Sequence, residues 1–216
     1  MHERILNAAF KAFCEEGYAG TSTLDIATSA KVSKRDLYAN FGSKHAVLVA
    51  CIKSRAERVQ RLPDLPAPRN RQMLAATLTA FGTNLVRETS DPTVIAAFRL
   101  AIAEVTRSPE VAQTLDSVGR DGARRAVAQL IARAQLRGLL GAGEPTEMAI
   151  QYFGLLWEGL MVGLLLGVAA MPGPTEAEQR ASRATAAFML LHPDPALDRG
   201  PECGPQPPLQ RQTGGP

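Results

Sequence analysis

The chain has 216 residues, of which 45% are hydrophobic and 5% aromatic, so it can bury one or two cores and is not expected to be disordered as a whole. Its net charge of +3 is unevenly placed, because residues 1–62 carry ten Lys or Arg against six Asp or Glu, and the remainder carries 14 against 15. A positive charge gathered in one segment favours a polyanionic partner such as nucleic acid, the alternative being a solvated basic face.

The cysteines and the hydrophobic runs exclude other classes of protein. Cys14, Cys51 and Cys203 are far apart and lack C-x-x-C spacing or a histidine partner, which argues against a disulfide framework or a zinc site. The N-terminus lacks the apolar segment of a signal peptide. The most apolar run, residues 159–171, has 13 residues, whereas a membrane span needs about 20. We therefore expect a reduced, cytoplasmic protein without a cofactor, a metal or a membrane span.

Catalytic patterns are also missing. The three histidines are isolated in the sequence, and neither a nucleophile elbow nor a metal-ligand spacing surrounds them. We therefore do not expect an enzyme and nominate no catalytic residue.

The first sixty residues predict four short helices. Apolar residues from Ile5 to Phe13 follow one helical stripe, and Gly17 suits the left-handed position after a helix. A second helix begins at Ser22 or Thr23 and ends near residue 30. Ser33 caps a third, with Asp36 at the capping-box position, and a fourth follows residues 42–43 and continues to about residue 61.

The stretch "RLPDLPAPRN" breaks this pattern with three prolines, so we place a domain boundary there. Beyond it, helical patterns cover residues 70–89, 92–107, 109–137, 146–170 and 175–191. The end of the chain is rich in proline and glycine and predicts disorder. We thus expect an all-α protein with domains at 1–62 and 63–192 and a disordered tail at 193–216.

The second and third helices have the lengths and the intervening turn of a helix-turn-helix, whose second helix enters the major groove of DNA. At 100° per residue, Leu37 and Phe41 lie about 40° apart and face inward with Val32. Arg35 and Ala39 then face outward. The helix is short and polar because its outer face is available to a ligand.

Each exposed position has a chemistry suited to DNA. Arg35 can bond O6 and N7 of guanine together, Ala39 permits contact with a thymine methyl group, and Lys34 can reach a base or a phosphate. Asp36 could accept from cytosine, but a capping role beside Ser33 is the favoured interpretation. Hydroxyls and helix N-termini commonly bind phosphate oxygens, which favours three backbone anchors. These are Thr23, Tyr38 and Lys44, the last strengthened by Ser43 at the start of its helix; a half-buried aromatic is the alternative for Tyr38.

The stretch "GYAGTSTLDIATSAKVSKRDLYANFGSKHAVL" resembles the DNA-binding domain of the TetR family of bacterial transcriptional regulators. The likeness covers about 45 residues and combines Thr-Ser-Thr at a helix start, Ile26-Ala27, Ala30-x-Val32-Ser33, Leu37-Tyr38, Phe41 and Ser43-Lys44. By this resemblance, Thr23, Tyr38 and Lys44 match phosphate contacts and residues 34–36 match positions that read the groove. Asn40 stands where the family often has histidine, and Lys31 replaces a common turn glycine.

The resemblance also implies that the C-terminal domain, joined through the fourth helix, dimerises and binds a small molecule. A dimer matched to a palindrome is the usual solution for a helix-turn-helix. Residues 146–191 are our candidate interface, because three glycines recur every four residues along one expected helix, although intrachain packing explains them almost as well. They are Gly159, Gly163 and Gly167. For a pocket we nominate Phe81, Phe98, Arg99, Tyr152, Trp157 and Met161, each of which could instead serve the core or an ion pair.

The leading hypothesis is a homodimeric transcriptional repressor that binds double-stranded DNA at a palindromic operator. A small hydrophobic effector would release it from that operator. The alternative is a weakly selective architectural or protein-interaction module that binds DNA without an effector.

Overall fold

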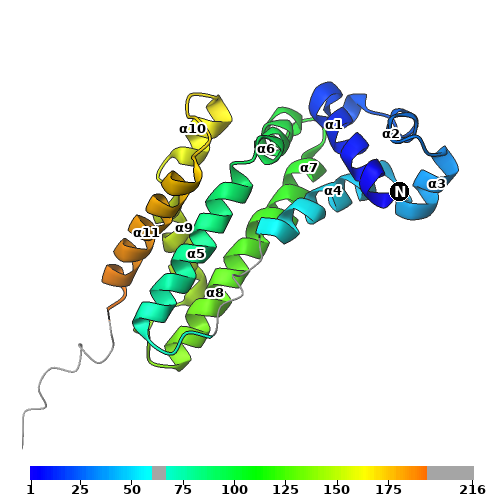
Figure 1. The fold of residues 1–216 in the computed structure, drawn as a ribbon. Helices are drawn as coiled ribbons and strands as arrows, with labels where there is room; N and C mark the ends of the chain where they lie inside the picture. The colour runs from blue at the N-terminus through cyan, green and yellow to red at the C-terminus, as the bar shows by residue number, and fades with distance from the viewer. Residues whose placement is uncertain (60–66, 194–216) are drawn as a thin grey trace, which may run out of the picture.

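The computed structural model describes residues 1–59 and 67–193, with side chains placed for residues 1–54 and 67–193. These residues form helices joined by short turns (Figure 1), and the all-α prediction is confirmed. The N-terminal helices are α1 (His2–Gly20), α2 (Thr23–Ala30), α3 (Lys34–Phe41) and α4 (Lys44–Val59). The others are α5 (Arg71–Thr89), α6 (Pro92–Glu104), α7 (Pro109–Thr114), the π-helical turn η1 (Leu115–Arg120), α8 (Asp121–Leu136), α9 (Pro145–Trp157), α10 (Leu160–Leu166) and α11 (Pro174–Leu191).

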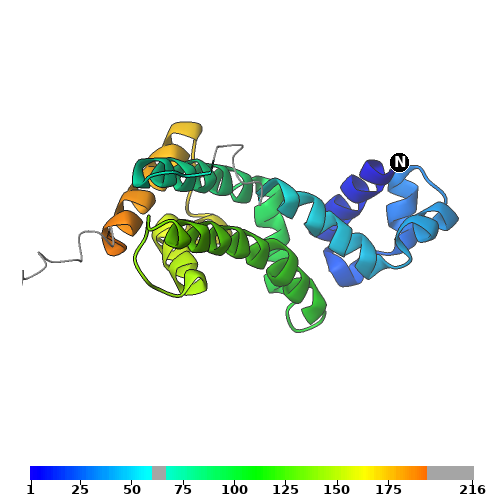
Figure 2. The ribbon, with the colours of Figure 1, turned by 90° about the horizontal axis from the view of Figure 1, so that it is seen from below.

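The molecule is elongated, with α1–α3 at one end and a helical bundle at the other (Figures 1 and 2). Helix α4 runs from the N-terminal helices to the bundle, where it packs against η1 and α5. Within the bundle, α11 lies along α5 and α9, and α8 lies along α9. The end that carries α3 is therefore far from α11, and α4 and α6 connect the two regions.

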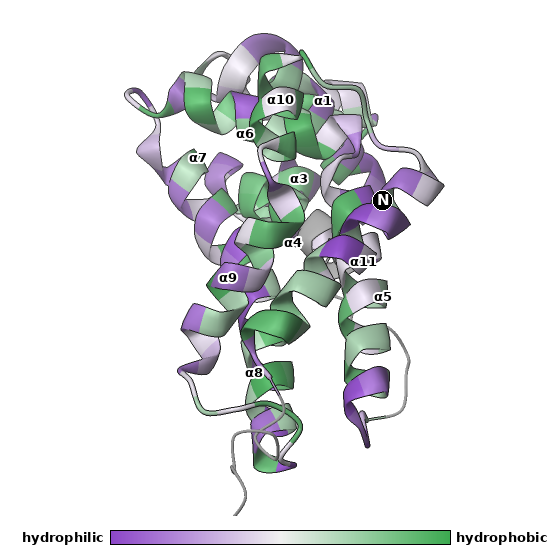
Figure 3. Ribbon diagram, turned by 90° about the vertical axis from the view of Figure 1, so that its left-hand side faces the viewer, coloured by the Kyte–Doolittle hydropathy of each residue, from purple (hydrophilic) through white to green (hydrophobic). Residues whose placement is uncertain are grey.

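Buried side chains form two hydrophobic clusters. The first joins α5, α8, α9 and α11 around Phe81, Tyr152 and Phe188, all fully buried. The hydroxyl of Tyr152 donates to the carbonyl oxygen of Leu78 at 2.7 Å, so this buried polar group is satisfied. Hydrophobic and hydrophilic residues alternate along the helices (Figure 3), as expected of helices that bury one face.

The second cluster joins α1–α4 to α6, α7 and η1. Fully buried Ile5, Ile26 and Leu37 come from the first three helices, whereas Leu100 and Leu115 come from α6 and η1. The N-terminal core therefore continues into the next part of the chain. The predicted boundary at residues 62–63 and nearly all of the predicted tail lie outside the described residues.

Helix starts follow the sequence signals. Asp91 precedes Pro92, and its carboxylate accepts from the backbone N–H of Thr93 at 2.8 Å, which begins α6. Pro109 and Pro174 likewise occupy the first turns of α7 and α11. Gly17 has a φ of +79°, as predicted for the end of the first amphipathic stripe.

Two long helices expected from the sequence are interrupted. A π-helical turn divides residues 109–136. The expected helix over 146–170 ends at Trp157 because Glu158 and Gly159 have φ values of 36° and 83°, and the axes of α9 and α10 differ by 56°. No single helix of the described residues is long and apolar enough to cross a membrane, although α9 and α10 pass that test when taken together as a bent pair.

This break corrects the expectation that three glycines share one helix face. Gly159 lies before α10 and Gly167 ends it, both with positive φ. Gly163 lies between them, and a Cβ atom there would fall 2.8 Å from the side chain of Ala169. The spacing of these glycines thus reflects a tight turn around a seven-residue helix and its packing within the chain.

Candidate nucleic-acid interface and apolar cavity

The turn between α2 and α3 is fixed by matching caps. Ser22 and Ser33 each accept from a backbone N–H three residues on, at Asp25 and Asp36, whose carboxylates accept from the serine backbone in return. Hydrogen bonds from Ser22 lower the pKa of the Asp25 carboxyl group. Lys31 ends α2 in the left-handed conformation, with φ 53° and ψ 49°. It does so without the freedom of glycine, so the turn carries some backbone strain.

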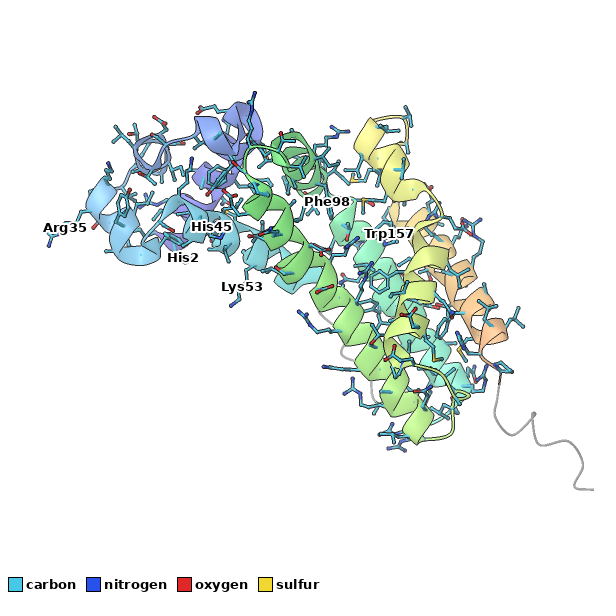
Figure 4. All side chains as sticks on the ribbon, turned by 180° about the vertical axis from the view of Figure 1, so that it is seen from behind. His2, Arg35, His45, Lys53, Phe98 and Trp157 are labelled. Carbon is cyan, nitrogen blue, oxygen red and sulfur yellow. The ribbon has the colours of Figure 1, made fainter. Side chains whose placement is uncertain are left out.

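Helix α3 has one buried side and a wide exposed side. Leu37 is fully buried, and Val32 and Phe41 pack half-buried against the same core, as the helical wheel predicts. The remaining side chains of the helix are exposed: Lys34, Arg35, Asp36, Tyr38, Ala39 and Asn40. Arg35 points away from the protein at its outer end (Figure 4).

Arg35 differs from its neighbours in its freedom to bind. The carboxylate of Asp36 accepts a hydrogen bond from the hydroxyl of Ser33 at 2.6 Å, which confirms the capping interpretation. The side-chain amide of Asn40 donates to the backbone carbonyl of Asp36 at 2.7 Å. No hydrogen bond or ion pair to Arg35 occurs among the described residues. The guanidinium group therefore keeps its donors for an external acceptor.

Two hydroxyl groups meet beside this exposed face. The oxygens of Thr23 and Tyr38 lie 3.3 Å apart and bring the N-terminus of α2 to the side of α3. Tyr38 is 43% exposed, so part of its ring is covered, and its alternative interpretation as a half-buried aromatic stays open. The ammonium of Lys34 lies 5.8 Å from the centre of its ring. These groups form a cluster of exposed donors suited to phosphate oxygens.

Lys44 is more enclosed than the sequence suggests. Its ammonium donates to the carbonyl oxygens of Tyr18 and Thr21, at 2.8 and 3.0 Å, and lies 4.6 Å from the ring centre of Tyr18. Ser43 caps α4 by accepting from the backbone N–H of Ala46 at 3.0 Å. Lys44 therefore ties the start of α4 to the end of α1, and one of its three N–H groups remains for another acceptor.

An apolar cavity of about 540 Å³ lies where α4 meets the bundle. Helices α4, α5, α6, α8, α9 and α10 and the turn η1 all contribute to its wall. Phe98, Trp157 and Met161, three of the residues nominated for a pocket, line it. Phe98 and Trp157 lie far from Arg35 along the molecule (Figure 4). The volume falls within the range of small-molecule sites, about 300–1,000 Å³.

The other three nominated pocket residues have different surroundings. Phe81 and Tyr152 are fully buried within the first core cluster and do not line this cavity. Arg99 donates to the backbone carbonyls of Leu164 and Leu165, at 2.9 and 3.0 Å, and so binds the C-terminal end of α10. Aromatic and cationic residues in this domain serve packing and capping as often as a cavity, which periodicity alone does not distinguish.

Several cavity residues were not nominated from the sequence. Ile52 comes from α4, and Arg120 and Arg124 come from η1 and the first turn of α8. The available signal is the pair of arginines four residues apart beside the buried Ala123. Because a π-helical turn shifts the register of the helix, an ordinary wheel misplaces this pair relative to the core.

Comparisons with known proteins agree with this arrangement. Residues 5–51 match the family described as bacterial regulatory proteins, tetR family, and residues 76–191 match the C-terminal domain of AefR-like transcriptional repressors. The chain belongs to the TetR family. The two matches cover the helix-turn-helix and most of the bundle. The resemblance therefore includes the larger half of the chain as well as the 45 or so residues around the helix-turn-helix.

Named TetR-family relatives are transcriptional regulators and not enzymes. The repressor Rv3405c of Mycobacterium tuberculosis is 32% identical over 133 residues, which are 59% of this chain and 66% of that protein. A regulator of Bacillus subtilis, YezE, is 25% identical over 50% of this chain. The match spans 57% of the length of YezE, so the chain covers about three fifths of the length of these relatives.

A solved structure covers more of the TetR-family chain. The TetR transcriptional regulator from Agrobacterium tumefaciens has a TM-score of 0.75 and 25% identity, and the match covers 91% of this chain and 97% of that one. The flavonoid-responsive regulator FrrA has a TM-score of 0.69 and 29% identity, with 88% and 96% covered. The N-terminal helix-turn-helix joined to a C-terminal helical domain is therefore an arrangement shared with this family.

Proposed function

We propose that the protein is a homodimeric transcriptional repressor that binds a palindromic operator through α3 and leaves it when a small apolar molecule enters the cavity. The observation that carries this proposal is the exposed outer face of α3, where Arg35 is presented on a capped helix and makes no hydrogen bond or ion pair to a described residue. The family, whose named members include repressors, supports regulation as the purpose of that face.

In this proposal the outermost side chains of α3 contact the bases of the operator. Arg35 supplies two parallel donors for O6 and N7 of guanine, and Ala39, one turn further, leaves room for a thymine methyl group. Lys34 extends from the first turn of the helix toward a base edge or a phosphate. Asp36 has its Oδ2 atom engaged by the cap, so it shapes the N-terminus of α3 and contributes less to base recognition.

Contacts to the DNA backbone surround this reading face. Thr23 and Tyr38 present adjacent hydroxyls, and the N-terminus of α4 at Ser43 and Lys44 adds backbone N–H groups and an ammonium. Such contacts fix the orientation of a helix in the groove without reading sequence. Asn40 donates to Asp36 within the helix and can offer its second amide hydrogen to a phosphate.

Dimerisation is proposed through the outer side of the last helices. Helix α11 buries Ala177, Ala181 and Phe188 against the bundle and leaves a second stripe exposed. That stripe ends in Ala186 and Leu190, the latter 82% exposed, and the next residue, Leu191, is 59% exposed, so two adjacent leucines are available to a partner. A twofold axis along this face leaves both copies of α3 at the outer ends, as a palindrome requires.

Release from DNA is proposed to act through α4. Ile52 contributes to the cavity wall and is 4% exposed, and the N-terminus of the same helix carries Lys44 beside the DNA-binding face. Changing a 1:99 ratio of states to 99:1 needs about 5.5 kcal/mol of differential affinity. Burial of about 250 Å² of apolar ligand surface supplies about 6 kcal/mol, so a modest ligand suffices if DNA-bound protein excludes it.

The test is a mobility-shift titration of the wild-type protein on DNA from upstream of its own gene, with random duplex as the comparison. Arg35→Ala should reduce the preference for the selected site by about tenfold or more, because a bidentate pair with guanine contributes about 1–3 kcal/mol of discrimination. Arg133→Ala on α8 is the matched control, since Arg133 is an exposed arginine of the distant bundle.

Two results would count against the proposal. An Arg35→Ala protein that selects the same palindrome as the wild type would refute the role of α3 in reading sequence. Equal affinity of the wild type for random and upstream duplex at physiological salt would instead favour the weakly selective, architectural alternative.

A further inference from the structure

We infer that the ligand of the apolar cavity is an anionic amphiphile, an apolar molecule with one carboxylate, which Arg124 binds. This inference deepens the proposed function, which it assumes in treating the cavity as the effector site. It concerns the chemical class of the effector, which neither the family nor the apolar volume specifies.

The charges of the cavity wall have one sign. Of its lining residues, Arg120 and Arg124 are the charged ones, and no acidic residue of the described chain lines it. Both arginines come from η1 and the start of α8, whereas Phe98, Trp157 and Met161 come from α6, α9 and α10. The wall therefore combines an apolar surface with cationic groups on two consecutive elements, η1 and α8. An amphiphile has the same division between its parts.

Arg124 has a buried donor without a partner. Its Nε atom is inaccessible to solvent and makes no hydrogen bond to any residue that the structure describes, and its side chain is only 29% exposed. Among the described residues, the carboxylate of Asp121 lies 4.0 Å from Nη1, at the limit of an ion pair, and also lies 3.7 Å from Arg125. Buried N–H groups are nearly always satisfied, so the guanidinium of Arg124, which lines the cavity and is only weakly paired, has hydrogen-bonding capacity left for an acceptor that enters from outside.

Arg120 plays a different part at the same wall. Its Nε and Nη2 atoms both contact Oδ1 of Asp116 at 2.6 Å and the side chain is 52% exposed, so its charge is already paired near the surface. Neutral acceptors could also satisfy Arg124, but they would leave its charge uncompensated in an apolar surrounding. A carboxylate matches the planar guanidinium geometrically and forms a charge-assisted hydrogen bond, which is about twice as strong as a neutral one.

The chain contains its own reporter for this interaction. Trp157 is its single tryptophan and lines the cavity, so the intrinsic fluorescence of the full-length protein reports occupancy directly. We suggest titrations with decanoate, decan-1-ol and decylammonium, which share one chain and differ in charge. Decanoate should bind at least tenfold more tightly than decan-1-ol, equivalent to about 1.4 kcal/mol, and decylammonium should bind more weakly than either.

Two variants test whether Arg124 is the source of the preference for decanoate over decan-1-ol. Arg124→Gln should remove the preference for decanoate and leave the affinity for decan-1-ol nearly unchanged, whereas Arg124→Lys should keep part of it. Arg125→Gln is the matched control, because Arg125 is the next residue, contacts the same Asp121, and does not line the cavity. Circular dichroism confirms that each variant is folded before it is titrated.

The wild-type comparison alone can overturn the inference, independently of any variant. Equal affinity for decanoate and decan-1-ol, tighter binding of decylammonium, or no saturable response of Trp157 to decanoate would each do so. Retention of the preference in Arg124→Gln would exclude Arg124 as its source. Failure of the proposed function looks different: a decanoate complex that still binds operator DNA refutes release, while the charge preference continues to support the ligand class.

Discussion

Lys44 offers a sharp test of how the N-terminal region combines folding with DNA binding. The resemblance to the TetR family assigns it to a phosphate, yet its ammonium already donates to the carbonyls of Tyr18 and Thr21. These contacts tie the start of α4 to the last turn of α1 and to the residue that follows it. Lys44→Met preserves the length of the side chain and removes every donor, so it separates packing from hydrogen bonding.

The magnitude follows from these two contacts. Hydrogen bonds to charged groups contribute about 1.5–3 kcal/mol each, and access of water to the half-buried ammonium reduces that value. We expect a loss of about 2 kcal/mol in the free energy of unfolding, which lowers Tm by about 4–8 °C for a chain of this size. If the third N–H group also neutralises a phosphate, the slope of log K against log salt concentration falls by about 0.9.

Thermal unfolding and salt-dependent DNA titration measure the two effects separately. Lys34→Met is the matched control, because Lys34 is exposed and its ammonium lies near the ring of Tyr38, 5.8 Å from the ring centre. That variant should change stability by less than about 0.5 kcal/mol while also reducing the salt slope. An unchanged Tm in Lys44→Met, or an equal fall in Lys34→Met, would refute the structural role assigned to Lys44.

Two further substitutions test local geometry. Lys31→Gly should stabilise the protein by about 1 kcal/mol, because glycine adopts the left-handed conformation without strain; Lys31→Ala, which removes the same charge but keeps Cβ, should give no such gain in Tm. Gly82→Ala should destabilise it by about 1–3 kcal/mol, because the new Cβ would clash with the hydroxyl of Tyr152. Tyr152→Phe removes that oxygen, so chemical denaturation of the double variant should show a total loss smaller than the sum of the single losses.

The N-terminal helices were largely predictable because their signals are local. Ser33 with Asp36, and Ser22 with Asp25, fix helix starts through neighbours three residues away, and the structure shows both capping boxes. The alternation of Leu37 and Phe41 with polar residues likewise determines which side of α3 is buried. The exposed positions of such a short helix can therefore be predicted from the sequence, and Arg35 is the clearest example, while its contact with a base stays a prediction.

The cavity was less predictable because it depends on contacts between distant segments. Ile52, Phe98 and Trp157 are separated by many residues and meet only in the folded chain. Two local irregularities contribute: the π-helical turn η1 and the break at Glu158–Gly159. Glu158 adopts a positive φ although it is not a glycine, and nothing in its residue type predicts this conformation. The sequence pattern therefore favoured one continuous helix at this point.

The π-helical turn η1 bears on the release that is proposed to act through α4. Helix α4 packs against η1, and η1 contributes Leu115 and Arg120 to the cavity wall. A π-helical turn contains one residue more than a regular turn over the same rise, and conversion to an α-helix would shift every side chain beyond it. A ligand bound at Arg124 is therefore well placed to bias η1, and α4 would carry that change to Lys44 and the DNA-binding face. Coupling of this kind requires differential affinity of the ligand for the two arrangements, which makes the DNA-bound affinity for decanoate the deciding quantity.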